Sequence, residues 1–256
     1  MEQFNNLEKA KLEYALRLGD SSLILGHRLS EWCGHGPILE QDIALTNIAL
    51  DLVGRAKTIL EYAAILENKG GTDDTLAFMR DALAYRNALL VEQPNNDFAF
   101  TIARQFLFDV YSFYFYEALK MSKDDTFSAI AAKSLKEISY HLRHSSEWIL
   151  RLGDGTAESH QRLQNAIDDL WIYTGDLFDM DEVDKILMGE KAAPNLNEIR
   201  GKWENKVSEI LTKATLKIPV NTWMMSGSRK GIHTEHLGYL LAEMQFLQRA
   251  YPNSKW

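Results

Sequence analysis

Acidic side chains stand inside several strongly apolar stretches of this 256-residue sequence. Asp109 is the only charged residue in the run 105–116, which is otherwise apolar, aromatic or neutral. Asn47, Asp51 and Arg55 recur every four residues, so they line one stripe of a helix. A carboxylate buried among apolar residues must be paired, hydrogen-bonded or bound to a metal. These positions could therefore serve either structural ion pairs or metal chemistry.

Two more segments combine carboxylates with histidines on one face. Glu137 and His141 are four residues apart, and Asp20 and His27 are seven apart. Both spacings place side chains on the same side of a helix. Inward-facing carboxylates on four helices are typical of a ferritin-like di-iron bundle, which takes a Glu from each of two helices and a Glu-x-x-His pair from each of the other two.

The histidine spacing argues against such a centre in this chain. None of the seven histidines has an acidic residue three positions before it, and the nearest approach is the Glu-x-x-Tyr formed by Glu137 and Tyr140. We therefore predict no catalytic residue and no bound metal, and we interpret the acidic positions as remnants of a metal site held in hydrogen-bonded pairs. The remnant positions are Asp20, Asp51, Asp109, Glu137, Tyr140 and His141.

Long helices are needed to carry these positions, and the sequence predicts them. No proline occurs between Pro94 and Pro194, and proline would interrupt helices and strands alike. The pattern predicts an all-α fold, a ferritin-like helical bundle formed by residues 1–256 as a single domain, with the helices after about residue 180 packed on the bundle. The predicted helices are 7–32, 39–68, 73–91, 97–121, 124–152, 157–178, 179–188, 195–216 and 233–250.

Composition narrows the class of protein. The net charge is −8 and no run of Lys or Arg resembles a nucleic-acid footprint. The single cysteine, Cys33, can form no internal disulfide, which favours a reducing compartment. No stretch reaches the 18 apolar residues typical of a membrane-spanning helix. We expect a cytoplasmic protein with neither nucleic-acid nor membrane partners.

Four parts of the sequence resemble a known family. They are LSEWCGHGP at 29–37, LLVEQPNNDF at 89–98 with ARQF at 103–106, KEISYHLRH at 136–144 with LGDGT at 152–156, and HTEHLG at 233–238 with LAEMQ at 241–245. Together they resemble the C-subunit family of the bacterial phenylacetyl-coenzyme A epoxidase (1,2-phenylacetyl-CoA monooxygenase) complexes over nearly the whole chain. The resemblance implies a ferritin-like, non-catalytic structural subunit that acts in aerobic phenylacetate catabolism.

The same resemblance implies partners and cofactors outside this chain. A related ferritin-like catalytic subunit would hold the di-iron centre and epoxidise the aromatic ring of phenylacetyl-CoA with dioxygen. A small bridging subunit and a reductase with FAD and an iron–sulfur centre would complete the complex. The substrate is expected near the subunit interface, and the candidates for contact with its CoA part are Tyr85, Arg86, Asn87 and Lys185. A solvated helix face is the alternative interpretation of these four residues.

Two other functions stay open at this point. One is a di-iron or di-manganese carboxylate enzyme active in its own right, with Asp51, Asp109, Glu137 and His141 as metal ligands. The other is a homo-oligomeric storage or binding protein of the ferritin type, although no ferroxidase ligand set occurs in the sequence.

Overall fold

The structure is a computed structural model that describes residues 2–220, 222–252 and 254, with the side chains described from residue 6 onward. Within these ranges all regular secondary structure is helical and no strand occurs. The chain divides into two compact units, and each is described by itself. Unit 1 consists of Met1–Gln93, Glu182–Leu187 and Gly227–Trp256, and unit 2 of Pro94–Asp181 and Met188–Ser226.

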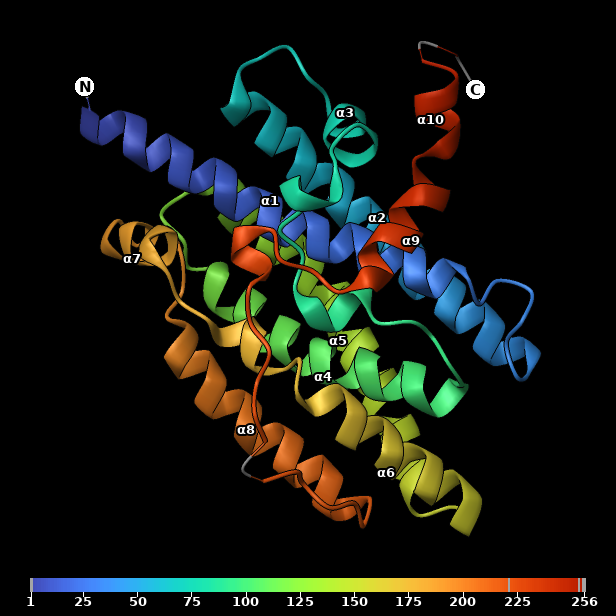
Figure 1. Cartoon of the computed structure of the whole chain (residues 1–256). Helices are drawn as coiled ribbons and strands as arrows, with labels where there is room; N and C mark the ends of the chain where they lie inside the picture. Colours follow the sequence, from blue (N-terminus) through green and yellow to red (C-terminus); the bar gives the residue numbers. More distant parts are fainter. Residues whose placement is uncertain (1, 221, 253, 255–256) are drawn as a thin grey trace. The chain divides into compact units, whose positions relative to one another are not determined.

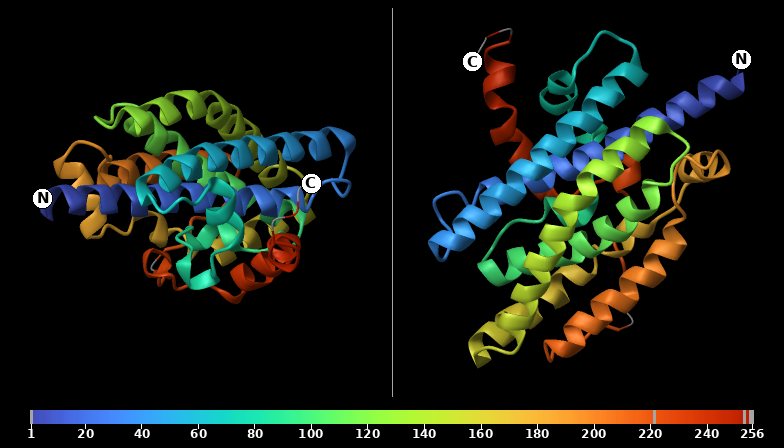
Figure 2. Two further views of the ribbon diagram at one scale, coloured as in Figure 1. Left: turned by 90° about the horizontal axis from the view of Figure 1, so that it is seen from above. Right: turned by 180° about the vertical axis from the view of Figure 1, so that it is seen from behind.

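Unit 1 is built on a long antiparallel hairpin of α1 (Glu2–Ser30) and α2 (Leu39–Glu67), which lie side by side in every view (Figures 1 and 2). Two glycines of α1 let the helices approach closely. A Cβ atom on Gly19 would lie 2.8 Å from Leu60 Cδ2, and one on Gly26 would lie 2.9 Å from Val53 Cγ2. The hairpin therefore depends on the absence of side chains at these two positions.

The remainder of unit 1 consists of short elements. They are α3 (Asp73–Phe78), the 3₁₀ turns Ala82–Ala84, Leu89–Glu92 and Ser228–Lys230, the first part of α7 (Glu182–Gly189), α9 (Glu235–Met244) and α10 (Phe246–Ala250). The residues of α7 join this unit through Asp184, whose buried carboxylate lies 3.2 Å from Arg17 Nη1 and 3.4 Å from Arg229 Nη1.

The prediction of a single helix over 73–91 is wrong, because side chains from the C-terminal helices take the carbonyls at the end of α3. Gln245 Nε2 donates to the carbonyls of Ala77 and Arg80, at 3.3 and 2.9 Å. Arg249 donates to the carbonyls of Phe78, Met79 and Arg80. The predicted helix 233–250 is itself divided, since α9 ends at Met244 and α10 begins at Phe246.

Unit 2 contains a second antiparallel hairpin, α4 (Phe98–Leu119) with α5 (Asp125–Gly153), together with α6 (Ala157–Trp171), the 3₁₀ turn Gly175–Phe178 and α8 (Leu196–Lys213) (Figure 2). Side chains fix the helix starts, as when Asp97 accepts from the backbone N–H of Phe100 and Asp124 from that of Phe127. Trp203 of α8 packs on Trp171 and donates its indole N–H to the carbonyl of Leu107 at 2.9 Å.

Most predicted helix boundaries lie within a few residues of the observed ones. The helix predicted over 39–68 is Leu39–Glu67, and the one predicted over 124–152 is Asp125–Gly153. In the described part of the chain, every helix is too short or too polar to cross a membrane. The single-domain organisation over 1–256 stays a prediction.

Candidate functional site

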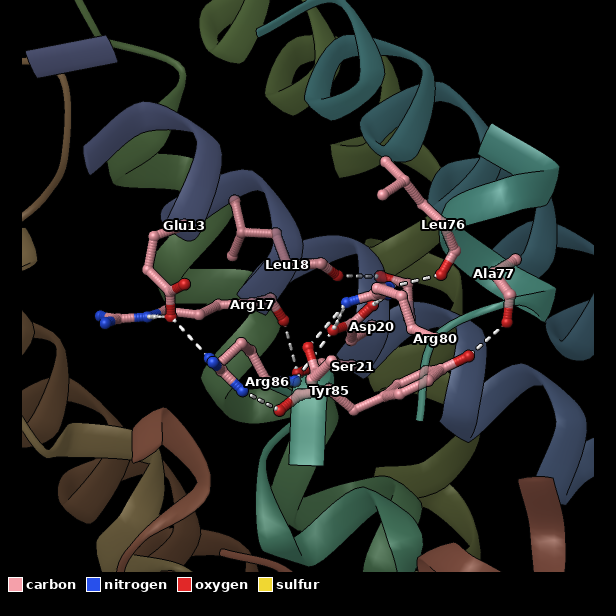
Figure 3. A network of polar contacts seen from close by, with 12 residues as sticks. Glu13, Arg17, Leu18, Asp20, Ser21, Leu76, Ala77, Arg80, Tyr85 and Arg86 are labelled. Atoms are coloured by element: carbon pink, nitrogen blue, oxygen red, sulfur yellow. Dashed lines mark hydrogen bonds and ion pairs between the residues drawn. The ribbon is translucent and has the colours of Figure 1, made fainter. Parts of the chain in front are cut away.

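Asp20 lies at the centre of a buried polar network in unit 1 (Figure 3). Both terminal nitrogens of Arg80 donate to its two oxygens, and the Nη1–Oδ2 distance is 3.0 Å. The backbone N–H of Arg86 adds a third hydrogen bond at 2.9 Å. Burial by itself would lower the pKa of Arg80, but the charge and hydrogen bonds of Asp20 outweigh it, so that pKa is raised. The result is a fixed bidentate ion pair, the arrangement that arginine and a carboxylate form most strongly.

Tyr85 closes this network from the other side (Figure 3). Its ring is fully buried, and the guanidinium carbon of Arg80 lies 4.4 Å from the ring centroid. The phenol donates to the carbonyl of Ala77 and accepts from Gln245 Nε2 at 3.1 Å. Burial, reinforced by the negative charge of Asp20, raises the pKa of Tyr85. The phenol is therefore a neutral hydrogen-bonding group.

Arg86 and Lys185 are the two predicted substrate-binding residues that reach solvent. Arg86 Nε donates to Glu13 Oε1 at 3.0 Å, and its side chain stays 22% exposed. Lys185 on α7 is 65% exposed, with its amine 3.7 Å from Glu182. Both cations are thus partly held by a carboxylate of the same unit and partly open to water.

Asn87 is fully buried, and it belongs to a second cluster centred on Glu92. The Glu92 carboxylate accepts from Asn87 Nδ2 at 2.8 Å and from the backbone N–H and hydroxyl of Thr234 at 2.6 and 2.8 Å. Its Oε2 also lies 2.8 Å from His233 Nδ1, while His233 Nε2 lies 3.0 Å from the carbonyl oxygen of Tyr85. Both ring nitrogens of His233 therefore face acceptors, which favours the doubly protonated ring.

The electrostatics of His233 agree with this geometry. Burial would lower the pKa of His233, but the hydrogen bond and the charge of Glu92 outweigh burial, and the carbonyl of Tyr85 adds to them, so the pKa is raised. Arg28 reinforces the cluster, because its Nε and Nη2 donate to the Glu92 carbonyl at 3.1 and 2.9 Å, and Nη2 also donates to that of His236 at 3.0 Å. The cluster joins α1, the 3₁₀ turn Leu89–Glu92 and the start of α9.

Unit 2 holds a different buried carboxylate, Asp109 of α4, which is 2% exposed. It accepts from Gln105 Nε2 at 2.7 Å and from the hydroxyl of Ser145 at 2.8 Å. The oxygen of the same hydroxyl lies 3.0 Å from the carbonyl oxygen of His141, one turn earlier on α5. Ser145 thereby links Asp109 to the backbone of one of the predicted remnant residues.

The other remnant positions differ in exposure. His141 is buried, Glu137 is half-buried, and Tyr140 is 40% exposed, with its ring centroid 6.2 Å from that of His141. Asp51 is half-buried on α2 and so belongs, like Asp20, to unit 1. Across the described residues, no group of three or more His, Cys, Asp or Glu side chains is placed to hold a metal ion. The interpretation of these six positions as remnants of a metal site stays a prediction.

Comparison with known proteins assigns the chain to a family. The model of the family described as phenylacetic acid catabolic protein matches residues 2–256. The chain belongs to the phenylacetic acid catabolic protein family. A curated relative, the C-subunit of the 1,2-phenylacetyl-CoA epoxidase of Escherichia coli (strain K12), is 50% identical over 243 residues, which cover 95% of this chain and 98% of the relative. The family resemblance of the sequence is thereby confirmed, as is the all-α, ferritin-like fold class.

In this member of the phenylacetic acid catabolic protein family, the networks of unit 1 have the chemistry of a scaffold. Asp20 and Glu92 each accept at least three hydrogen bonds from donors of the same unit. A carboxylate engaged in this way is stabilised in its charged form and is poorly suited to accept a proton. The arrangement therefore fixes α1, the segment 80–92 and α9 to one another.

The sequence alone did not identify Glu92, Arg80 or Arg28 as members of the site. A signal existed for Glu92, which is the only charged residue in the apolar run 88–92. Arg80 and Arg28 carried no such signal, because their partners lie 60 or more residues away along the chain. His233 precedes Thr234, the N-cap residue of α9, and its side chain is taken up by Glu92.

Proposed function

We propose that this protein is a non-catalytic structural subunit of a multicomponent di-iron oxygenase that epoxidises the aromatic ring of phenylacetyl-CoA. The observation that carries the proposal is the 50% identity, over 95% of the chain, to a protein named as the C-subunit of such an epoxidase. The proposed setting is phenylacetate catabolism in the cytoplasm. The oxygenase chemistry is assigned to a related ferritin-like catalytic subunit, with a small bridging subunit and a reductase that carries FAD and an iron–sulfur centre.

The polar networks support a structural role for this chain. Arg80 and His233, two cations with raised pKa values, are engaged with Asp20 and Glu92 inside unit 1. Such ion pairs fix the relative positions of the elements that supply them, at the cost of desolvating both charges. A rigid surface of this kind suits a subunit that stabilises its partner. The proposal therefore assigns no catalytic residue, metal or other cofactor to this chain.

Co-expression tests the proposal directly. The catalytic subunit is produced with and without this chain, and its soluble yield and its epoxidation of phenylacetyl-CoA are measured with the reductase and bridging subunits present throughout. We expect both to fall sharply when this chain is absent. A catalytic subunit that is soluble and fully active without it would contradict the structural role.

Elemental analysis of the purified chain tests the alternative, a di-iron or di-manganese enzyme in its own right. Stoichiometric iron or manganese that is lost in Asp109→Ala, but kept in the exposed control Asp169→Ala, would overturn the non-catalytic assignment. We expect no metal that depends on Asp109.

Contact with substrate is a further part of the proposal. Arg86 and Lys185 are the candidates with access to solvent, and their charges suit the phosphates of a CoA thioester. Tyr85 and Asn87 are buried, so their proposed part is to hold the segment that carries Arg86.

A further inference from the structure

One face of α2 is exposed along its whole length although it carries large apolar side chains. Its four large apolar residues are Leu39, Ile43, Leu50 and Ile65, which are 71, 51, 65 and 73% exposed. The face, called here the α2 stripe, spans about 39 Å of helix at 1.5 Å per residue. Apolar groups gathered along one surface in this way mark interaction sites. The exposed residues of the stripe are Leu39, Ile43, Asn47, Leu50, Gly54, Lys57, Glu61 and Ile65.

Gly54 sits near the middle of the stripe, where glycine destabilises a helix relative to alanine. Packing within the chain does not require it, because a Cβ atom at Gly54 would have no heavy atom within 4 Å. Gly26 of α1 differs, since a Cβ there would collide with Val53. Gly201 of α8 is equally open, but its exposed helical neighbours, such as Glu204, are polar. Gly54 alone of these three leaves a gap within an apolar stripe.

The spacing of the stripe reads the same in both directions. Its members follow one another in steps of four, four, three, four, three, four and four residues, so the pattern is symmetric about position 52. A helix with this pattern is complementary to an antiparallel copy of itself, as a two-fold interface requires. The facing pairs are Leu39 with Ile65, Ile43 with Glu61, Asn47 with Lys57, and Leu50 with Gly54 of the second copy.

Charge selects the antiparallel direction. A parallel, in-register copy would place Lys57 against Lys57 and Glu61 against Glu61, and like charges at such distances repel. In the antiparallel copy the amine of Lys57 meets the amide of Asn47. Glu61, whose Oε1 lies 3.9 Å from Lys57 Nζ of its own helix, lays its methylenes on Ile43.

We propose that the α2 stripe is a homodimer interface, on which a second copy of this chain docks antiparallel across a two-fold axis at the level of position 52. Leu50 of each copy fills the gap above Gly54 of the other. The absent side chain at Gly54 lets the two helix axes come within the 8–10 Å of ordinary helix packing. This inference goes beyond the proposed function and does not rest on it.

Thiol crosslinking tests the register. The exposed native thiol is first removed with Cys33→Ser, and Leu39→Cys and Ile65→Cys are then introduced singly and together. The two positions lie about 39 Å apart on one helix, so they cannot react within a chain. With an oxidant or a short bis-maleimide, we expect covalent dimers from the double variant and from a mixture of the two single variants. Dimers formed by either single variant alone would indicate a parallel pair and overturn the proposal.

Sedimentation velocity tests the dimer itself. The expected mass is twice 29.3 kDa. Gly54→Leu fills the gap and should raise the dimer dissociation constant about tenfold or more. Gly201→Leu gives the same gain in helix propensity on a polar face and should leave the constant unchanged, and circular dichroism checks that both variants fold.

Two results would overturn the proposal. One is a wild-type chain that is monomeric up to about 0.1 mM, the upper end of biologically useful affinities. The other is a Gly54→Leu variant that dimerises as tightly as the wild type. A chain that is monomeric alone, yet crosslinks through Leu39→Cys to a co-expressed second subunit, would replace the second copy with that subunit and leave the proposed function intact.

Discussion

The two units bury their carboxylates in different ways. In unit 1, Asp20 is held by the guanidinium of Arg80, and Glu92 by the imidazole of His233. In unit 2, the Asp109 carboxylate accepts hydrogen bonds from the amide of Gln105 and the hydroxyl of Ser145, both of which are neutral. The same residue chemistry, an acid in an apolar helix, is thus combined with cationic donors in one unit and with neutral donors in the other.

This difference determines how each region responds to change. Removing a cation from a buried ion pair leaves a charge with neither partner nor water, which is expensive. Removing one neutral donor leaves the carboxylate with its other hydrogen bonds, so the loss is that of a single bond to a charged group. The expected stability effects follow this order.

Arg80→Met should cause the largest loss, about 3–5 kcal/mol of unfolding free energy, because it strands the fully buried Asp20. The measurement is urea unfolding followed by circular dichroism. The double variant Asp20→Leu with Arg80→Met should recover much of the loss, since an apolar pair replaces the ion pair. Arg200→Met, at an ion pair whose arginine is 53% exposed, is the matched control and should change little. If Arg80→Met behaves like that control, the ion pair does not stabilise unit 1.

Ser145→Ala should cost less, about 1.5–3 kcal/mol, the usual range for one hydrogen bond to a charged group. It removes the 2.8 Å bond to Asp109 from a fully buried position. Ser139→Ala on the same helix is the control, because its exposed hydroxyl donates only to the carbonyl of Leu135. A loss as large as that of Arg80→Met would show that the two units do not differ in the way described.

The pH dependence of stability should have opposite signs in the two units. The pKa of His233 is raised in the folded state, so its stabilisation is complete below the unfolded value of about 6.5 and is lost as the pH rises through the folded pKa. Relative to His233→Gln, the wild type should therefore lose unfolding free energy above about pH 6.5.

His144 of unit 2 supplies the contrast. Burial, and next the charge of His141, lower the pKa of His144, so its effect appears as the pH falls below about 6.5. Relative to His144→Gln, the wild type should lose unfolding free energy toward acid. Urea titrations at several pH values measure both slopes. Slopes of the same sign for the two histidines would contradict the assignment.

Lys185→Ala should have the smallest effect on stability, within about 0.5 kcal/mol, as is usual for exposed positions. In the assembled complex it should raise the KM for phenylacetyl-CoA without lowering kcat, if Lys185 contacts the CoA part as proposed. Lys133→Ala, another exposed lysine, is the control and should leave KM unchanged. An unchanged KM in Lys185→Ala would remove this residue from the proposed substrate contacts.

The sequence predicted the long helices well because their signals are local. The apolar pattern of 39–68, closed by Gly70 and Gly71, specified α2 to within one residue. The lone charge in the run 105–116 indicated a carboxylate that must be buried and hydrogen-bonded, and Asp109 is both. Periodicity and composition are properties of neighbouring residues, so they can be read without the fold.

Tertiary structure decided what lies between residues 73 and 92. The pattern there is helical, yet the helix ends at Phe78, because Gln245 and Arg249 satisfy the carbonyls that further turns would have used. Arg80 then turns its guanidinium to Asp20, a residue 60 positions earlier. Local propensity cannot anticipate donors that arrive from a distant part of the chain, and these donors outweigh it.

The sequence by itself therefore determined the helical class, the buried acids and the family of this protein. Only the tertiary structure decided which donor each acid meets: arginine for Asp20, histidine for Glu92, and an amide and a hydroxyl for Asp109. The physical reason is that a buried charge must be satisfied wherever the fold places it, and the available donor is chosen by packing rather than by spacing along the chain.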